Sequence, residues 1–199
     1  MGGVPSRRLV LASASPARLR LLRDAGLAPE ARISGVDESG VTGRSHDVVL
    51  ELAVRKAHAV ASTQDDALVV GCDSLLDLEG RVLGKPASPA EAVARWHDLR
   101  GRSGYLLTGH CVVDTRTGDS VSDVCATIVR FGEPTDAEIE AYVATGEPLH
   151  VAGAFTLGGR SAAFLTGIDG DAGNVVGLSL PMLRALLAKL DVSLVDLWH

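Results

Sequence analysis

A short apolar run that leads straight into a helix start constrains this chain most strongly. The run is Leu9–Ala12, and residues 13–18 behind it read Ser-Ala-Ser-Pro-Ala-Arg. Ser15 before Pro16 is a typical N-cap and first-turn pair, because proline has no N–H to leave unsatisfied there. Leucines at helical spacing follow, and Gly26 is a typical residue just past a helix end. The stretch therefore predicts a strand, a short loop and a helix.

The third position of that helix holds Arg18, where an acid is usual. A cation there opposes the helix dipole by about 0.3–1 kcal/mol, so local stability does not select it. A second Ser-Pro start, at Ser88, carries Glu91 at the same position. An anion bound at the helix start would make the cation favourable there, and Ser13, Ser15 and Arg18 would then bind phosphate. A solvated surface arginine explains this stretch equally well.

Composition narrows the class of protein. The chain is 46% hydrophobic but only 4% aromatic, which predicts an aliphatic α/β core. Its length of 199 residues predicts one domain over residues 1–199 or two small lobes. The net charge of −6 argues against a nucleic-acid polymer as partner. Three cysteines without a C-x-x-C pair favour a reducing compartment and no zinc site.

The chain shows no membrane signal. No run approaches spanning length, and the run behind Arg7-Arg8 is too short for a signal peptide. Residues 1–6 match the loose myristoylation pattern, which without a second anchor we take as chance. We expect no membrane partner and a cytoplasmic location.

Lys56 interrupts an apolar helix face. After an expected strand at 31–36, residues 45–62 predict a long helix with its apolar stripe on one side and charges opposite. Lys56 falls within the stripe, so it either snorkels from the core edge or reaches into a cleft. Only three lysines stand against sixteen arginines, and Lys85 is another of them.

Asp73 interrupts the most strand-like run, residues 67–76. Glu79-Gly80 predicts a two-residue hairpin turn that returns the chain toward Lys85. With Leu78 opposite Arg81, Asp73 would pair with Pro86; a shift of one residue would place Lys85 opposite Asp73. Either register brings the two charges within side-chain reach. An ordinary cross-strand ion pair is the simpler explanation.

These residues suit phosphate chemistry with a hard metal. Cations at 18, 56 and 85 and carboxylates at Asp37, Glu38 and Asp73, without a sulfur or histidine cluster, favour Mg²⁺ shared with substrate phosphates. Asp73 could hold metal or accept a proton from water. The P-loop, the dinucleotide fingerprint and the nucleophile elbow are all missing from the sequence.

Taken in order, the motifs resemble the Maf family of nucleoside triphosphate pyrophosphatases over nearly the whole chain. They are Ser13-Ala-Ser-Pro-Ala-Arg18, Val36-Asp-Glu38, Lys56-Ala57, Gly71-Cys-Asp-Ser74, Gly84-Lys-Pro86, Gly153-Ala-Phe155 and Asn174-Val-Val-Gly177.

The resemblance implies a twisted mixed β-sheet flanked by helices, with two lobes around a central cleft as in Maf and ITPase-like proteins. It implies a divalent-metal-dependent hydrolase, using Mg²⁺ or Mn²⁺, that cuts a nucleoside triphosphate between the α and β phosphates. The family is linked to clearing unwanted nucleotides and to cell-division arrest. Asp73 would be the catalytic proton acceptor. Ser13, Arg18, Lys56 and Lys85 would bind phosphate, and Glu38 with Asp73 would hold the metal.

Three departures from the family pattern stand out. Ala17 replaces the first of two arginines that often follow the proline. The strand motif, Gly71-Cys-Asp-Ser74, matches neither of its common forms. Residues 156–161 read Thr-Leu-Gly-Gly-Arg-Ser, where the family has a glutamine and a glycine-rich run. Base preference and oligomeric state therefore stay open, and a homodimer is compatible with the pattern. A non-catalytic nucleotide-binding regulator of division and a phosphatase that releases orthophosphate stepwise are the rival hypotheses.

Overall fold

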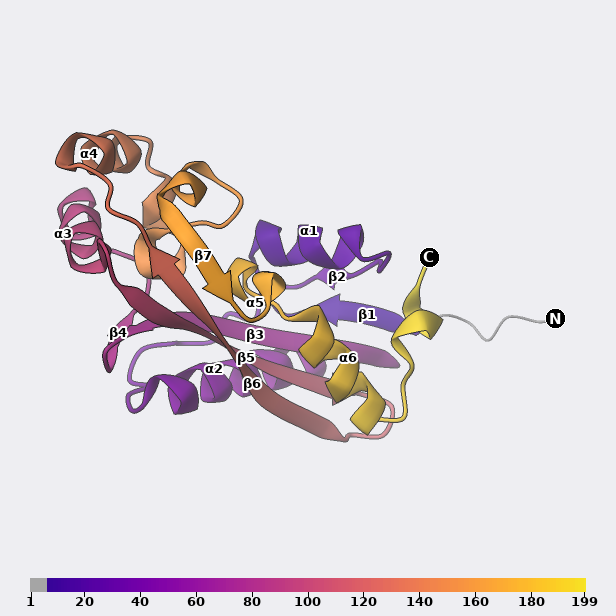
Figure 1. Ribbon diagram of the computed structural model, residues 1–199. Helices are drawn as coiled ribbons and strands as arrows, with labels where there is room; N and C mark the ends of the chain where they lie inside the picture. The colour runs from indigo at the N-terminus through magenta and orange to yellow at the C-terminus, as the bar shows by residue number, and fades with distance from the viewer. Residues whose placement is uncertain (1–6) are drawn as a thin grey trace. The chain divides into compact units, whose positions relative to one another are not determined.

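The computed structural model describes residues 7–199, so the myristoylation-like pattern at 1–6 lies outside it (Figure 1). The chain forms two compact units. Unit 1 contains the residues up to Asp73, Thr108–Cys125 and Gly177–His199, and unit 2 contains Ser74–Leu107 and Ala126–Val176. The expectation of a single domain over residues 1–199 stays a prediction, as does the central cleft.

The strands form a mixed sheet. They are β1 (Arg8–Leu11), β2 (Glu30–Ala31), β3 (Ala67–Leu78), β4 (Arg81–Leu83), β5 (Ser103–Asp114), β6 (Ser120–Phe131) and β7 (Leu165–Asp169). Among the described residues the hydrogen-bonded order is β2-β1-β3-β5-β6-β7, with β4 beside β3. In unit 1, β1 runs parallel to β2 and β3; in unit 2, β4 and β7 are antiparallel to their neighbours. The predicted mixed sheet with flanking helices is confirmed.

The described residues contain six α-helices, and two of them begin at the Ser-Pro starts that the sequence predicts. The six are α1 (Pro16–Asp24), α2 (Ser45–Ala61), α3 (Pro89–Leu99), α4 (Asp136–Ala144), α5 (Ala172–Val176) and α6 (Leu180–Lys189), with short 3₁₀ turns at Glu147–His150, Ala152–Ala154, Arg160–Phe164 and Leu194–Leu197. Ser15 and Ser88 cap α1 and α3 through their side chains. The long helix expected at 45–62 is confirmed as α2.

The strand expected at residues 31–36 is wrong. β2 ends at Ala31, and Ile33 beyond it is 77% exposed. Arg32 N still donates to Leu11 O at 2.9 Å, but the ladder does not continue. The apolar residues of this segment therefore do not reflect burial in the sheet.

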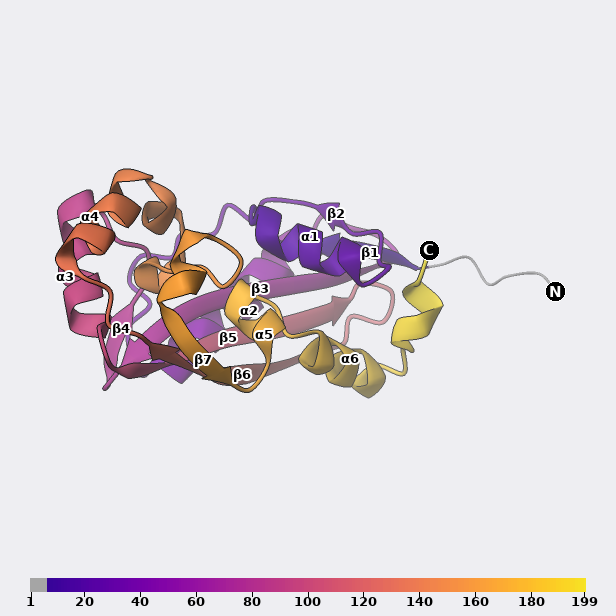
Figure 2. The ribbon, with the colours of Figure 1, turned by 45° about the horizontal axis from the view of Figure 1, so that its top comes forward.

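Unit 1 buries both faces of its strands. Leu9 and Leu11 of β1 pack in one cluster with residues of α1 and α6, whereas Val10 and Ala12 pack in another with α2. Figures 1 and 2 show α1 and α2 on opposite faces of these strands. A strand covered on both faces reads as a continuous apolar run, which is why the Leu9–Ala12 signal is strong.

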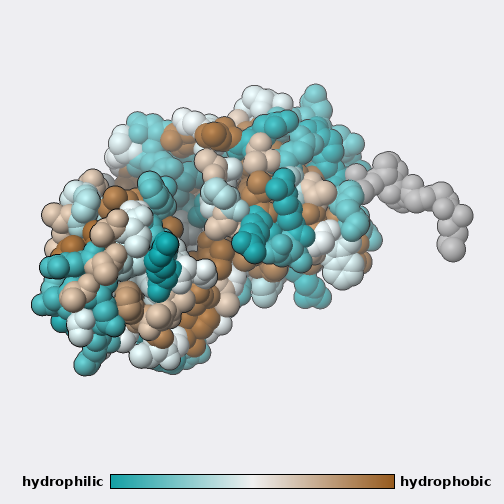
Figure 3. Space-filling model, turned by 90° about the horizontal axis from the view of Figure 1, so that it is seen from above, coloured by the Kyte–Doolittle hydropathy of each residue, from teal (hydrophilic) through white to brown (hydrophobic). Residues whose placement is uncertain are grey.

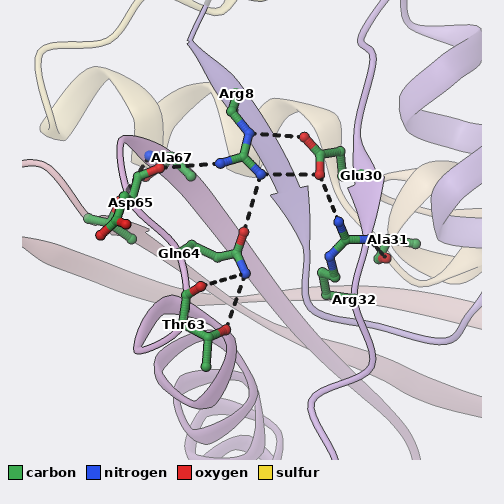
Figure 4. Close-up of polar contacts among 9 residues, drawn as sticks. Arg8, Glu30, Ala31, Arg32, Thr63, Gln64, Asp65 and Ala67 are labelled. Atoms are coloured by element: carbon green, nitrogen blue, oxygen red, sulfur yellow. Dashed lines mark hydrogen bonds and ion pairs between the residues drawn. The ribbon is translucent and has the colours of Figure 1, made fainter.

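Ion pairs fasten the beginning of β1 within unit 1. Arg8 donates to both carboxylate oxygens of Glu30 at 3.0 and 3.2 Å and to Gln64 Oε1 at 3.3 Å (Figure 4). Arg7 pairs with the buried carboxylate of Asp114 through two hydrogen bonds of 2.5 and 2.6 Å. The two arginines thus have structural partners.

Unit 2 is built around Trp96 of α3. Its ring contacts Phe131, Tyr142 and Phe164 edge to face, with ring centroids 5.6–5.9 Å apart. The indole N–H donates to Ala154 O at 2.8 Å, so the buried polar atom is satisfied. The few aromatic residues of the chain are largely concentrated in this core.

The surface mixes side chains of both kinds. On the face in Figure 3, hydrophilic and hydrophobic residues alternate over short distances. Among the described residues, the exposed large hydrophobic side chains are Ile33, Val82, Tyr105, Val195 and Trp198. Within residues 7–199, no helix has the length and apolar character needed to cross a membrane.

Candidate active site

Two glycines let α2 approach the strands of unit 1 closely. A Cβ at Gly71 of β3 would lie 2.4 Å from Ala53 O and 2.7 Å from Ala57 N, and one at Gly109 of β5 would lie 2.1 Å from Val49 O. Any side chain at either position would push the helix away. This close packing sets the distance at which α2 can present Lys56 to the neighbouring strand.

Lys56 joins two carboxylates. Its Nζ lies 2.6 Å from Asp73 Oδ1 and 2.7 Å from Glu38 Oε1. Lys56 and Asp73 are each only 8% exposed, whereas the Glu38 side chain is 57% exposed. The expectation that Lys56 lies within an apolar face is confirmed, and its ammonium offsets the cost of a buried carboxylate on β3.

Burial dominates the electrostatics of Asp73. It raises the pKa of the Asp73 carboxyl above its ordinary value, while the charges of Lys56 and Arg18 oppose the rise and that of Glu38 adds to it. A carboxylate with a raised pKa binds a proton more readily, as a general base requires. Burial also raises the pKa of the neighbouring Cys72 thiol to about 11, so this thiol stays protonated and is a poor nucleophile near neutral pH.

The helix start of α1 folds its polar groups around Ser13. The Ser13 hydroxyl oxygen accepts from Ser15 N at 3.1 Å and from Arg18 Nη1 at 3.2 Å. The Ser15 hydroxyl oxygen accepts from Arg18 N at 3.4 Å as the helix cap. Part of the donor set expected for phosphate is therefore engaged within the loop itself. The Ser13 O–H can still donate to an oxygen.

Arg18 is held by backbone carbonyls of unit 1. Its Nε donates to Gly177 O at 2.7 Å and its Nη1 donates to Cys72 O at 3.0 Å. The interpretation of Arg18 as a solvated surface arginine is wrong, because the side chain leans back over the helix start toward Ser13 and the residue before Asp73. The structure thus brings Ser13, Arg18, Lys56 and Asp73 into one region, with Glu38 bound to Lys56.

Sequence reasoning assigned no role to Gly177, which receives the Arg18 side chain. Gly177 has φ of 120°, and a Cβ there would lie 3.0 Å from Arg18 Nε. Glycine is therefore required both by the backbone and by the close approach of the guanidinium. The one available signal was the Asn174-Val-Val-Gly177 motif, whose partner cannot be inferred from local sequence.

Lys85 belongs to unit 2, after the hairpin. Leu78 pairs with Arg81 and Leu76 with Leu83, so the alternative register shifted by one residue is wrong. The turn residues Glu79 and Gly80 both have positive φ, as the predicted turn requires. β4 ends at Leu83, and Lys85 is exposed beyond it. Proximity of Lys85 to Asp73 stays a prediction.

The oxygen donors fit a hard divalent cation. The described residues contain no group of three or more His, Cys, Asp or Glu side chains arranged to hold a metal. Mg²⁺ is commonly bound by one or two carboxylates together with substrate phosphates. Glu38 and Asp73, brought together by Lys56, fit that pattern as a pair of carboxylates.

Comparison with known proteins identifies the family of this chain. The Maf-like protein family matches residues 8–190. The chain belongs to the Maf family. This match includes every site residue discussed above, and the resemblance carried by the ordered motifs is confirmed.

Relatives of this Maf protein carry a common name. A "Nucleoside triphosphate pyrophosphatase" of Streptomyces coelicolor is 64% identical over 98% of this chain and 96% of its own length. A protein of the same name from Synechococcus elongatus is 52% identical over 96% of this chain and 98% of its own length. Among solved structures, the Staphylococcus aureus Ham1 protein is similar with a TM-score of 0.46 and 17% identity over 64% of this chain and 73% of that chain.

Proposed function

We propose that this Maf protein hydrolyses a nucleoside triphosphate to the monophosphate and pyrophosphate. The observation that carries the proposal is the buried Asp73 carboxylate, held by Lys56 beside Arg18 and Ser13. A general base with cations next to it is what water attack on a phosphate anhydride requires. The names of the closely similar relatives support the same reaction.

In the proposed reaction, Asp73 accepts a proton from a water molecule. The oxygen of that water forms a bond to the α-phosphorus, and the bond from that phosphorus to the bridging oxygen of the β-phosphate breaks. Pyrophosphate leaves with the electron pair. The phosphate oxygens would be bound by Ser13, Ser15, Arg18, Lys56 and Lys85, and Ser15 would also cap the helix start. Asp73 and Glu38 would hold Mg²⁺ or Mn²⁺, which would neutralise phosphate charge.

The test uses purified protein, Mg²⁺ and a panel of ordinary and modified triphosphates, with pyrophosphate and orthophosphate measured separately. A β,γ-imido triphosphate should still be cleaved, because its α–β anhydride is intact, and an α,β-methylene analogue should resist. Stepwise orthophosphate release would establish the phosphatase hypothesis. Binding without release of either product would establish the non-catalytic regulator.

Asp73→Asn tests the role of the base. We expect turnover to fall by at least about 1,000-fold with the fold intact, because the amide cannot accept the proton. The matched control is Asp98→Asn, at an exposed aspartate of α3 that pairs with Arg81 at 3.0 Å. The control should turn over as the wild type does. Wild-type turnover by Asp73→Asn would contradict the assignment.

The finer assignments rest on the same site. We propose a small-molecule nucleotide as the partner, with no nucleic-acid polymer and no membrane, and a cytoplasmic location. The net charge of −6 supports the first exclusion, because phosphate polymers favour a positively charged surface. The panel of triphosphates ranks the bases, and light scattering in solution tests for a homodimer.

A further inference from the structure

His110 of β5 is fully buried in unit 1, and both of its ring nitrogens are engaged. Nε2 lies 2.8 Å from Ser179 N, and Nδ1 lies 3.0 Å from Thr108 O. A backbone N–H can only donate, so Nε2 must be the acceptor and the proton lies on Nδ1, which donates to Thr108 O. These contacts fix a neutral imidazole in one tautomer.

Ser179 needs the acceptor that His110 supplies. It is the N-cap of α6, and its hydroxyl oxygen accepts from Met182 N at 3.1 Å. The cap side chain therefore satisfies a helix donor but not the N–H of Ser179 itself. Ser179 is 1% exposed, so without His110 this N–H would lose a buried hydrogen bond.

The segment fixed by His110 also orients Arg18. Gly177, two residues before Ser179, accepts from Arg18 Nε at 2.7 Å. Leu178 between them is fully buried and packs in the same core cluster as Leu22 of α1. The Gly177–Ser179 segment is too short to absorb a large displacement, since three extended residues span only about 10 Å. A displacement at Ser179 is therefore passed on to the carbonyl that receives the guanidinium.

We propose that His110 is a positioning residue that fixes the Gly177–Ser179 segment, so that the Gly177 carbonyl orients Arg18 for phosphate binding. His110 itself does not touch substrate. Histidine suits the position because one side chain accepts at Nε2 while it donates at Nδ1, and its ring keeps both atoms in fixed geometry. The kinetic part of this inference rests on the proposed function.

Two isosteric variants separate the two nitrogens. His110→Gln places an amide oxygen near the position of Nε2 and can still accept from Ser179 N–H. His110→Asn reaches only the position of Nδ1, so it can donate to Thr108 O but leaves Ser179 N–H without its acceptor. We expect KM for the triphosphate to rise about 10-fold in His110→Asn with a smaller change in kcat, and to stay within about twofold in His110→Gln.

A double-mutant cycle tests whether the effect passes through Arg18. In the Arg18→Ala background, His110→Asn should change KM by less than about twofold. Leu187→Ala, at another fully buried residue of unit 1, controls for lost stability and should lower Tm without raising KM. If His110→Asn does not fold, His110→Met replaces it, since it fills a similar volume without the acceptor. An equal rise in KM with and without Arg18 would overturn the proposal.

A measurement without catalysis separates this inference from the proposed function. The ¹⁵N-labelled Nε–H of Arg18, identified by its loss in Arg18→Lys, should be protected from hydrogen exchange in the wild type and in His110→Gln. Exchange should be at least about 10-fold faster in His110→Asn. Equal protection in all three proteins would overturn the positioning role. If the wild type releases no pyrophosphate, the proposed function fails and this measurement still decides the inference.

Discussion

Lys56 and Lys85 are two of three lysines in the chain, and the structure supports them in different ways. In unit 1 the charge of Lys56 is fixed directly, because Nζ contacts Glu38 and Asp73 at 2.7 and 2.6 Å. In unit 2 the side chain of Lys85 is exposed. Hydrogen bonds from α3 instead hold the backbone before and after Lys85, at Gly84 and Ala87.

Two residues of α3 form this backbone support in unit 2. Arg95 donates to Gly84 O, and Glu91 accepts from Ala87 N at 2.8 Å. Arg95 and Glu91 also pair with each other at 2.6 Å. The ammonium of Lys56 stabilises the fold because it pairs with a buried carboxylate. The charge of Lys85 is not needed for stability, because only the backbone beside it is held. The comparison therefore predicts that the two lysines separate stability from activity.

Replacing each lysine by methionine should give the largest contrast. Lys56→Met should lower the free energy of unfolding by about 3 kcal/mol, because Asp73 is left buried without its ammonium partner. Lys85→Met should change it by less than about 0.5 kcal/mol while still raising KM for triphosphate. Urea denaturation and steady-state kinetics measure the two effects. Equal losses of stability would remove the distinction between the two regions.

A glycine from each region tests how closely the backbone is packed. Gly71→Ala should destabilise the protein by about 2–3 kcal/mol, because the new Cβ overlaps the α2 backbone near Ala53. Gly84→Ala is the matched control, since its Cβ would make only an ordinary contact of 3.8 Å with Leu75. Urea denaturation should show a clear loss for the first variant only. A Gly71→Ala variant as stable as the wild type would show that α2 can move without cost.

Removing Arg95 tests the backbone support of unit 2. Arg95→Leu should cost about 2 kcal/mol of unfolding free energy, since it removes a buried charged donor to Gly84 O. It should also raise KM severalfold in the wild-type background and have no effect on KM in Lys85→Met. Arg81→Leu, at an exposed arginine, is the control and should be nearly neutral. A KM effect that persists without Lys85 would contradict the supporting role.

The Arg7–Asp114 pair predicts a smaller, pH-dependent contribution in unit 1. Its hydrogen bonds lower the pKa of the Asp114 carboxyl to about 2, below its ordinary value near 3.9. The stabilisation is therefore complete above about pH 4 and is lost as the pH falls through 2. Asp114→Asn should remove about 1–2 kcal/mol of acid-dependent stability, measured by urea denaturation from pH 5 to pH 2. An unchanged acid dependence would show that other carboxylates cause it.

Local signals predicted much of the fold. Ser15 and Ser88 cap helices as expected, and the Glu79-Gly80 turn sets the hairpin register. These features depend on neighbours within a few residues, so the sequence contains their physical cause. The segment at 31–36 misled because an apolar composition does not show whether a partner strand continues beside it.

The sequence by itself determined where α1 and α3 begin, that Lys56 lies on an apolar face, and that Asp73 interrupts a buried strand. The tertiary structure decided which groups these residues meet. Arg18 is held by Cys72 and Gly177 carbonyls, 54 and 159 residues away in the chain. Such contacts depend on helix–strand packing across the whole of unit 1, which local propensity and capping cannot specify.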